Sequence, residues 1–211
     1  MAKGFTVKAK SPAKKKATQE WDYDKAWELL RGKSLVFCMP GRGCSYVFLK
    51  NFVQMAFDLV QHGVSIQISQ DYSSMVNFAR CKCLGANVLR GPDQIPWDGK
   101  LKYDYQLWID SDIVFKTEQL LQLVLMDKDI AAGWYMTEDG QTTSVAHWLD
   151  EDNFRNNGGV MNHETGETMS KRKKQFMCGE DVSFCLDALE AGFEIWCDPR
   201  IRVGHEKTRI I

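Results

Sequence analysis

Apolar residues in this chain follow two patterns, short continuous runs and longer segments in which they recur every three or four positions. The short runs are rich in β-branched and aromatic residues, which is typical of buried strands. The strands we predict are residues 34–39, 64–69, 86–89, 105–115, 129–136 and 194–197. The helices we predict are residues 21–31, 45–62, 74–84, 117–126 and 178–191.

Local signals mark several helix ends. Ser45 and Thr117 stand where a hydroxyl can cap a first turn, and Gly63 and Gly85 stand where a helix stops. Because strands and helices alternate, the order favours a mainly parallel, doubly wound α/β sheet in a single domain. Ligands bind such sheets beyond the carboxyl ends of the strands. We therefore expect the loops after the first, second and fourth predicted strands to converge.

The second half of the chain is less regular. Residues 141–149 alternate loosely and are expected to form a small antiparallel hairpin with the preceding strand. Residues 150–175 are polar, rich in Asn and Gly, and contain the basic run 171–174. Long irregular loops in compact domains are commonly functional. We interpret this segment as a lid that is mobile without a substrate.

The composition is that of a soluble globular domain. The chain has 211 residues, of which 44% are hydrophobic and 26% charged, and this length is sufficient to bury one core. No apolar run has the length of a membrane span or the position of a signal-peptide core. The seven cysteines follow no disulfide or zinc framework, which favours free thiols and a cytoplasmic location.

Charge is distributed unevenly. The net charge is −1, but residues 1–16 hold six lysines and no acid, so the remainder carries −7 (−1 minus 6). An acidic body is a poor general binder of nucleic acid, so we expect no nucleic-acid partner. We expect residues 1–18 to be a disordered arm and residues 19–211 to form the folded domain.

Two carboxylates interrupt the apolar segment 105–115. Only Ser111 separates Asp110 from Asp112, and carboxylates rarely enter a strand unless their charge is compensated. One interpretation is a turn that the Asp side chains cap. The other is a pair of oxygen ligands for a hard divalent cation. His205 adds an imidazole beside a permissive glycine, and this set suits Mn²⁺ or Mg²⁺ with positions left for phosphate oxygens.

Glu180 and Asp181 follow a glycine at the start of a predicted helix. They are either cap and dipole partners of that helix or a general base that takes a proton from an attacking hydroxyl. Trp134 and Trp148 are core residues by default, or stack on a sugar ring. Further side chains on the predicted loops and helices are either solvated or contact a nucleotide donor: Pro40, Arg42, Asp71, Asn77, Arg80, Ser111 and Lys207.

Three segments together resemble the GT-A-fold glycosyltransferases. Residues 107–115 (Leu-Trp-Ile-Asp-Ser-Asp-Ile-Val-Phe) look like their Asp-x-Asp motif. Residues 176–185 (Phe-Met-Cys-Gly-Glu-Asp-Val-Ser-Phe-Cys) resemble their acceptor-side segment, and residues 198–207 (Asp-Pro-Arg-Ile-Arg-Val-Gly-His-Glu-Lys) resemble the segment that brings a histidine to the metal. The set is Fringe-like and similar to glycosyltransferases of chlorella viruses.

This resemblance implies a transferase that moves a hexosyl or deoxyhexosyl group from a UDP-sugar to a glycan or glycoprotein, viral capsid glycan included, in the host cytoplasm. It implies dependence on Mn²⁺, with Mg²⁺ as the alternative. By analogy Asp110, Asp112 and His205 fall on the metal and diphosphate positions, with Asp110 acting through water or the ribose. Asp181 falls on the base of inverting members, and Glu180 on the acceptor side.

The resemblance also sets the alternatives. The chain ends just after the third motif, which favours a domain of a longer polypeptide with further domains. One alternative is a metal-dependent phosphohydrolase or nucleotidyltransferase, although the phosphohydrolases usually carry Thr where Val114 stands. Another is a non-catalytic module that binds sugar nucleotides. A dinucleotide oxidoreductase is disfavoured, because no G-x-G-x-x-G follows the first predicted strand.

Overall fold

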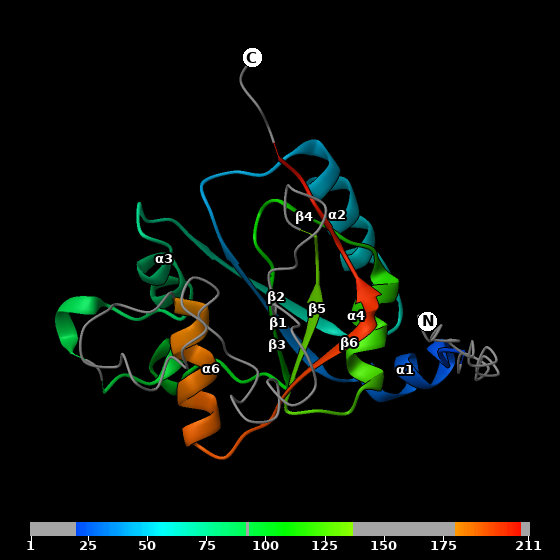
Figure 1. The fold of residues 1–211 in the computed structure, drawn as a ribbon. Helices are drawn as coiled ribbons and strands as arrows, with labels where there is room; N and C mark the ends of the chain where they lie inside the picture. The colour runs from blue at the N-terminus through cyan, green and yellow to red at the C-terminus, as the bar shows by residue number, and fades with distance from the viewer. Residues whose placement is uncertain (1–19, 92, 137–179, 208–211) are drawn as a thin grey trace, which may run out of the picture.

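The computed structural model describes residues 20–91, 93–136 and 180–207 of the chain. Strands lie in the middle and helices cover them on both sides (Figure 1). The helices are α1 (Tyr23–Leu30), α2 (Tyr46–Gln61), α3 (Val76–Cys83), α4 (Thr117–Leu125) and α6 (Glu180–Glu190), with 3-10 turns η1 (Val88–Arg90) and η2 (Pro96–Gly99). The strands are β1 (Ser34–Pro40), β2 (Ser65–Asp71), β3 (Tyr105–Trp108), β4 (Ile113–Val114), β5 (Ile130–Trp134), β6 (Ile195–Arg202) and β7 (Gly204–His205).

The strands pair mainly in parallel. The largest sheet has the order β2-β1-β3, with both neighbours parallel to β1. Strands β5 and β6 form a second parallel pair, and β4 and β7 form a short antiparallel pair. The prediction of a mixed α/β fold with a mainly parallel sheet and a small antiparallel element is thus confirmed at this level. The antiparallel element, however, joins residues 113–114 to 204–205 and is not the hairpin that we predicted.

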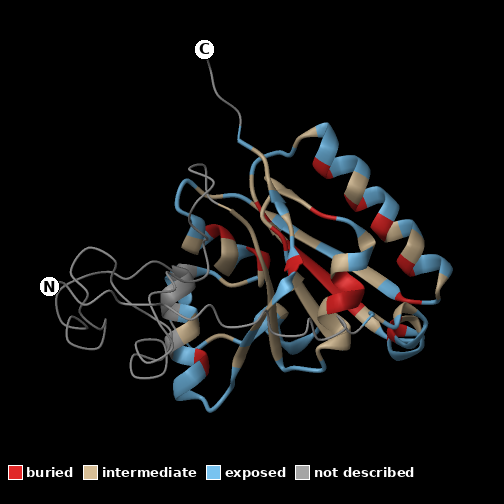
Figure 2. Ribbon diagram, turned by 45° about the vertical axis from the view of Figure 1, so that its right-hand side comes forward, coloured by how far each residue is buried: buried red, intermediate tan, exposed pale blue. Residues whose placement is uncertain are grey.

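Alternate side chains of β1 enter two separate cores. Leu35 and Phe37 pack with α1, α2 and α4 on one face of the sheet, and Val36 and Cys38 pack with α3 on the other. Figure 2 shows this buried strand and the buried side of α2 that faces it. Burying each such side chain contributes roughly 1.5–3 kcal/mol relative to exposure. Because both faces of β1 are apolar, the strand needs helices on both sides, which produces the doubly covered sheet.

The signals at the ends of α2 and α3 act as predicted. The Ser45 Oγ accepts a hydrogen bond from the Phe48 amide (3.1 Å), so Ser45 is the N-cap of α2. Gly63 follows the end of α2 at φ +78°, and Gly85 follows α3 at φ +72°. Both angles lie in the left-handed region that favours glycine.

The strand predicted at residues 86–89 is wrong, because residues 88–90 form the turn η1. The Asn87 side chain accepts a hydrogen bond from the Leu89 amide (2.9 Å), which folds the chain back locally. The Gln94 side chain accepts from the Asn87 amide and donates to its carbonyl. These bonds occupy the backbone groups that a strand would offer to a sheet.

The continuous strand predicted at residues 105–115 is also wrong. It breaks into β3 and β4, with a turn between them in which the Ile113 amide donates to the Asp110 carbonyl (3.1 Å). The predicted cap of α4 needs correction as well, since Lys116 is the N-cap and Thr117 is the first helical residue. The Gln119 side chain caps the Lys116 amide, while the Thr117 hydroxyl donates to Asp58 of α2.

Other predictions fall outside the described residues: the hairpin at 141–149, the lid at 150–175 and the arm at 1–18. Among the residues that the structure does describe, no helix has both the length and the apolar character required to cross a membrane.

Candidate functional site

The site lies where the carboxyl ends of β1, β2 and β3 meet. The Gly41 amide, just past β1, donates to the Asp71 carbonyl at the end of β2 (3.0 Å). The Gln70 side chain donates to the Gly41 carbonyl. A Cβ atom placed on Gly41 would lie 2.9 Å from Ser111 Oγ. The predicted donor residues Pro40 and Asp71, which end β1 and β2, and Ser111, in the turn after β3, therefore come from three adjoining segments.

Strand pairing places His205 beside Asp112. His205 on β7 is the register partner of Ile113 on β4, and the Glu206 amide donates to the Asp112 carbonyl (2.7 Å). Across this junction His205 Nε2 lies 2.9 Å from Asp112 Oδ2. The imidazole is 12% exposed and the carboxylate 43% exposed, so the carboxylate faces solvent while the ring is held by the protein.

Two further side chains complete the surroundings of this pair. The Lys207 ammonium lies 3.4 Å from the same Asp112 oxygen. The Tyr135 ring, just after β5, lies 4.3 Å from the His205 ring between centroids. The imidazole is therefore held between Tyr135 and Asp112. The cation that faces the Asp112 carboxylate is the Lys207 ammonium.

Two other predicted acids, Asp110 and Asp71, each face a cation on α3. Arg80 Nη2 lies 3.6 Å from Asp110 Oδ2, and Lys82 Nζ lies 3.4 Å from Asp71 Oδ1. Asn77 lies on the same helix, one turn before Arg80. α3 thus presents basic side chains to the end of β2 and to the segment that follows β3.

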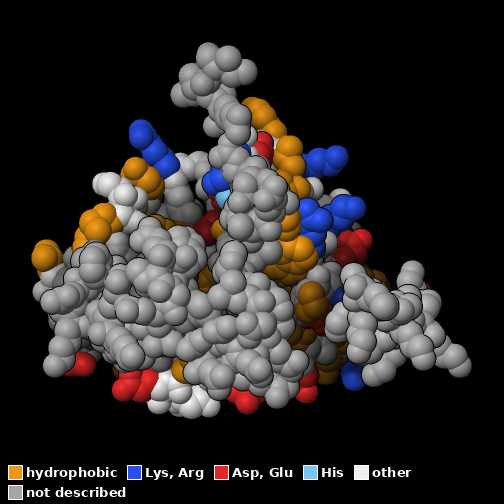
Figure 3. All heavy atoms as spheres, viewed as in Figure 1, with side chains coloured by type: hydrophobic (Ala, Val, Ile, Leu, Met, Phe, Trp, Pro, Cys, Tyr) orange, Lys and Arg blue, Asp and Glu red, His pale blue; other side chains and the backbone are white. Residues whose placement is uncertain are grey.

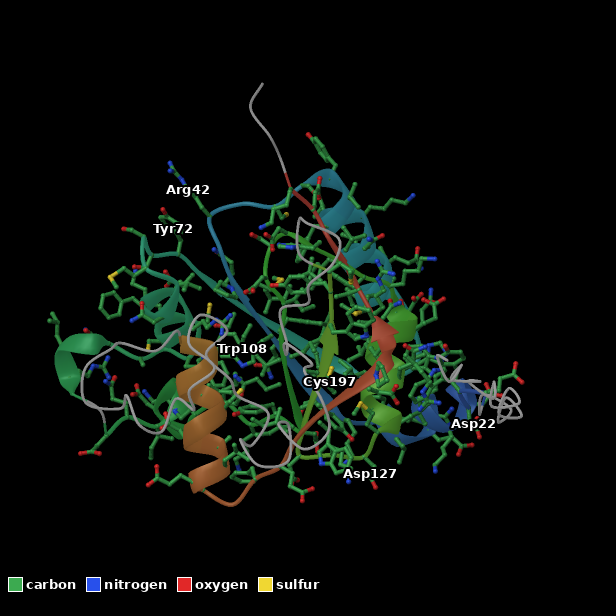
Figure 4. All side chains as sticks on the ribbon, in the orientation of Figure 1. Asp22, Arg42, Tyr72, Trp108, Asp127 and Cys197 are labelled. Atoms are coloured by element: carbon green, nitrogen blue, oxygen red, sulfur yellow. The ribbon has the colours of Figure 1, made fainter. Side chains whose placement is uncertain are left out.

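Arg42 and Tyr72 extend from neighbouring loops at this end of the sheet (Figure 4). The Arg42 guanidinium carbon lies 5.9 Å from the centroid of the Tyr72 ring, within range of a cation–π contact. Tyr72 is 46% exposed, so its ring is accessible to a planar ligand.

Trp134 lies on the β5–β6 pair. Its indole nitrogen donates to the Pro199 carbonyl (2.9 Å), and the Arg202 guanidinium lies over its ring. The Glu180 and Asp181 backbones open α6 as predicted. The side chains of both residues, and all of Trp148, lie outside what the structure describes.

The buried cysteines offer no reactive thiol to this site. Burial raises the pKa of the Cys38 thiol to about 11, and burial also raises the pKa of the Cys83 thiol. Cys38 of β1 and Cys83, the last residue of α3, lie in the same small core on one face of the sheet, and both thiols stay protonated near neutral pH. A protonated thiol is neither a nucleophile nor a metal ligand.

Sequence reasoning missed four residues. Tyr135 had no local signal, because its contact with His205 joins distant parts of the chain. Lys82 had none either, because its contact with Asp71 depends on how α3 packs against β2. Ser45 was predicted only as a cap, but its hydroxyl also donates to the Glu206 carboxylate. Glu206 directly follows His205, and this position was the one available signal.

The residues present fit an open cation site in part. Within residues 20–91, 93–136 and 180–207, no group of three or more His, Cys, Asp or Glu side chains is close enough to hold a metal. Asp112 and His205 nevertheless offer an oxygen and a nitrogen within 2.9 Å of one another. Two protein donors suffice where a diphosphate and water fill the remaining positions.

A cavity of about 660 Å³ lies elsewhere. It opens at the amino ends of β3, β5 and β6, where its lining includes Asp104, Asp129 and Glu194. Ligands of parallel sheets bind at the opposite edge, so this cavity is not the candidate site.

Comparison of the chain with known protein families, with curated proteins and with solved structures found no match.

Proposed function

We propose that this chain is a glycosyltransferase domain of the GT-A type, which moves a sugar from a nucleoside-diphosphate donor, such as a UDP-sugar, to a hydroxyl of a glycan or glycoprotein. The observation that carries the proposal is the 2.9 Å contact between His205 and Asp112, which are 93 residues apart. An imidazole and an accessible carboxylate meet at the edge of the sheet where ligands bind.

Basic side chains around this pair support an anionic donor. Lys207 lies beside Asp112, Arg80 beside Asp110, and Arg42 above the exposed Tyr72. Lys207 and Arg80 are suited to the diphosphate, because an ammonium and a guanidinium both bind phosphate oxygens. Tyr72 offers a face on which a base can stack.

Asp112 and His205 would hold Mn²⁺, or Mg²⁺ as the alternative, and Asp110 would act through water or the ribose. When bound, the cation would supply positive charge that stabilises the leaving diphosphate. At the start of α6, Asp181 would take the proton from the acceptor hydroxyl, with Glu180 beside it on the acceptor side. Trp134 is proposed to contact the acceptor sugar.

The test is calorimetric titration of UDP and UDP-sugars into the chain with and without Mn²⁺. We expect binding that requires Mn²⁺, and loss of at least tenfold in affinity in Asp112→Ala. Glu28→Ala, an exposed acid on α1, is the matched control and should bind as the parent does. Full donor affinity in Asp112→Ala with Mn²⁺ present would contradict the proposal.

Labelled UDP-sugar separates the alternatives in one assay. Sugar transferred to an acceptor supports the transferase, whereas release of phosphate without transfer supports a phosphohydrolase or nucleotidyltransferase. Mn²⁺-dependent binding with no turnover on any acceptor supports a binding module. A melting-temperature screen of nucleotide sugars selects the donor for this assay, because a ligand that binds the folded state raises the melting point.

A further inference from the structure

Helix α2 has apolar residues on two sides of its circumference. One side packs on the sheet through Phe48, Phe52, Met55 and Leu59. The second side, roughly 130° further around the helix, consists of Tyr46, Leu49, Val53, Phe57 and Val60, and these five residues are here called the α2 stripe. Tyr46 is 90% exposed, Phe57 61% and Val60 56%. A helix that is apolar on both sides is normally buried on both sides.

The α2 stripe is narrow, continuous and poor in charge. At 3.6 residues per turn its five side chains fall within roughly 80° of the helix circumference and span about 21 Å. Of the residues in α2, only Lys50 and Asp58 are charged. Figure 3 shows a column of hydrophobic side chains on the upper part of the molecule, with Lys and Arg side chains beside it. Depletion of charge around exposed aromatic residues is the composition of an interface core.

We propose that the α2 stripe is the contact surface of a homodimer, in which α2 packs antiparallel against α2 of a second copy. The spacing of the stripe is nearly symmetric about Val53. With a twofold axis at Val53, Tyr46 lies opposite Val60 and Leu49 opposite Phe57, so each large side chain meets an apolar partner. A twofold interface requires this self-complementarity, because the same patch serves both copies.

The charged residues permit this arrangement. About the same axis, Lys50 lies opposite Ala56 rather than opposite a second Lys50, and its aliphatic stem can cover apolar surface. Asp58 lies on the polar flank of the helix, where the Gln54 side chain donates to its carboxylate (2.8 Å). No charge of either copy is therefore placed in the centre of the contact.

The area of the stripe sets the expected strength. From their exposed fractions, the five side chains offer roughly 600 Å² per copy, against about 800 Å² per partner in a standard interface. An interface at the lower end of the size range is typical of weak, reversible association, so we expect the monomer and the dimer to exchange with concentration.

Other occupants fit less well. The Lys-rich arm at residues 1–16 has no apolar spacing with which to fill the stripe. A bilayer surface is disfavoured because residues 17–211 carry a net −7 (−1 minus the +6 of the arm), which opposes approach to anionic lipids. The near-symmetry about Val53 is the feature that favours a second copy over an unrelated protein.

The experiment is sedimentation velocity of the full chain from 1 to 200 µM. We expect the mass to rise from one chain, 24.2 kDa, toward two. Tyr46→Lys and Phe57→Lys should raise the dissociation constant at least tenfold. Leu89→Lys, which changes another side chain that is 90% exposed but lies off α2, is the matched control and should leave dimerisation unchanged. Circular dichroism of each variant establishes that it is folded.

A second measurement tests the axis. In a Cys44→Ser background, Val53→Cys should form a disulfide-linked dimer under mild oxidation, because the two Val53 positions face one another across the axis. Ile95→Cys, at an exposed position away from α2, should not. A chain that stays monomeric at 200 µM overturns the proposal, as does a dimer that persists in Phe57→Lys. Flotation of a monomeric chain with lipid vesicles would overturn it in favour of a membrane contact.

Discussion

The Ser45 hydroxyl donates a hydrogen bond to the Glu206 carboxylate and accepts one from the Phe48 amide. One side chain thus caps α2 and fixes the segment that carries His205. The Glu206 amide in turn donates to the Asp112 carbonyl. This connection ties the first strand–helix unit to a segment 161 residues away, and it holds the imidazole against the carboxylate.

We expect Ser45→Ala and Glu206→Ala each to weaken Mn²⁺-dependent UDP binding several-fold, because each releases the segment that carries His205. The double variant should lose little more than either single one, since both remove the same bond. Ser45→Ala should also cost about 1 kcal/mol of stability through the lost cap. The measurement is a double-mutant cycle on UDP affinity at fixed Mn²⁺. Gln54→Ala, which breaks a different hydrogen bond on α2, is the control, and additive losses would contradict a shared role.

We expect Lys207 to lower the affinity of the proposed site for the cation and to raise its affinity for the diphosphate. Its ammonium lies 3.4 Å from Asp112, so it repels a cation and attracts a diphosphate. We expect Lys207→Met to bind Mn²⁺ alone a few-fold more tightly and UDP with Mn²⁺ more weakly. Titration of each ligand separately measures this, with Lys50→Met on α2 as the control. If both affinities fall together, Lys207 has only a structural role.

Gly41 should be required for the approach of the loops. A Cβ on Gly41 would lie 2.9 Å from Ser111 Oγ, whereas a Cβ on Gly43 would meet nothing within 4 Å. We expect Gly41→Ala to cost roughly 1–3 kcal/mol and to weaken UDP binding, and Gly43→Ala to change neither. Adding Ser111→Gly should restore part of the stability, because the φ of +157° at Gly41 also disfavours alanine. Urea denaturation compares the variants, and no recovery in the double variant would refute this contact.

The features that sequence could predict are those that local chemistry determines. Ser45 and Gly63 mark the ends of α2 because a cap and a stop act within one turn. The parallel order follows from the alternation of strands and helices. The break at Asp110 was missed, because β4 is stabilised by β7, about 90 residues later. A two-residue strand has no period of its own, and its pairing is a property of the folded chain.

The residues of the candidate site likewise include some that the sequence could predict and some that it could not. The carboxylates and the imidazole could be named from their residue types, and the edge of the sheet near which Asp110 and Asp112 lie followed from the strand order. Their cationic partners could not, because Arg80 and Lys82 look like an ordinary solvated helix face in the sequence. Which basic side chain faces which acid depends on the rotation of α3 against the sheet, and Cys83 and Ala79 fix that rotation by packing inward.

Asp104 should make the stability of the fold depend on pH in the acid range. Its carboxylate accepts hydrogen bonds from the Ser34 amide (2.8 Å) and hydroxyl (2.9 Å), and Lys33 lies 3.1 Å away. These bonds join the starts of β1 and β3. The hydrogen bond from the Ser34 amide, followed by that from its hydroxyl and the contact with Lys33, holds the pKa of Asp104 below its ordinary value.

A carboxyl group whose pKa is lower in the folded state stabilises that state above the unfolded pKa, and this contribution is lost as pH falls through the folded pKa. The free energy of unfolding of the parent should therefore exceed that of Asp104→Asn by a constant amount from pH 5 to 8. The difference should shrink as pH falls below about 4, the ordinary pKa of Asp. Urea denaturation at each pH measures it, and Asp24→Asn, an exposed acid on α1, controls for loss of a charge. A difference that grows on acidification would show that Asp104 is not held as a carboxylate by Ser34.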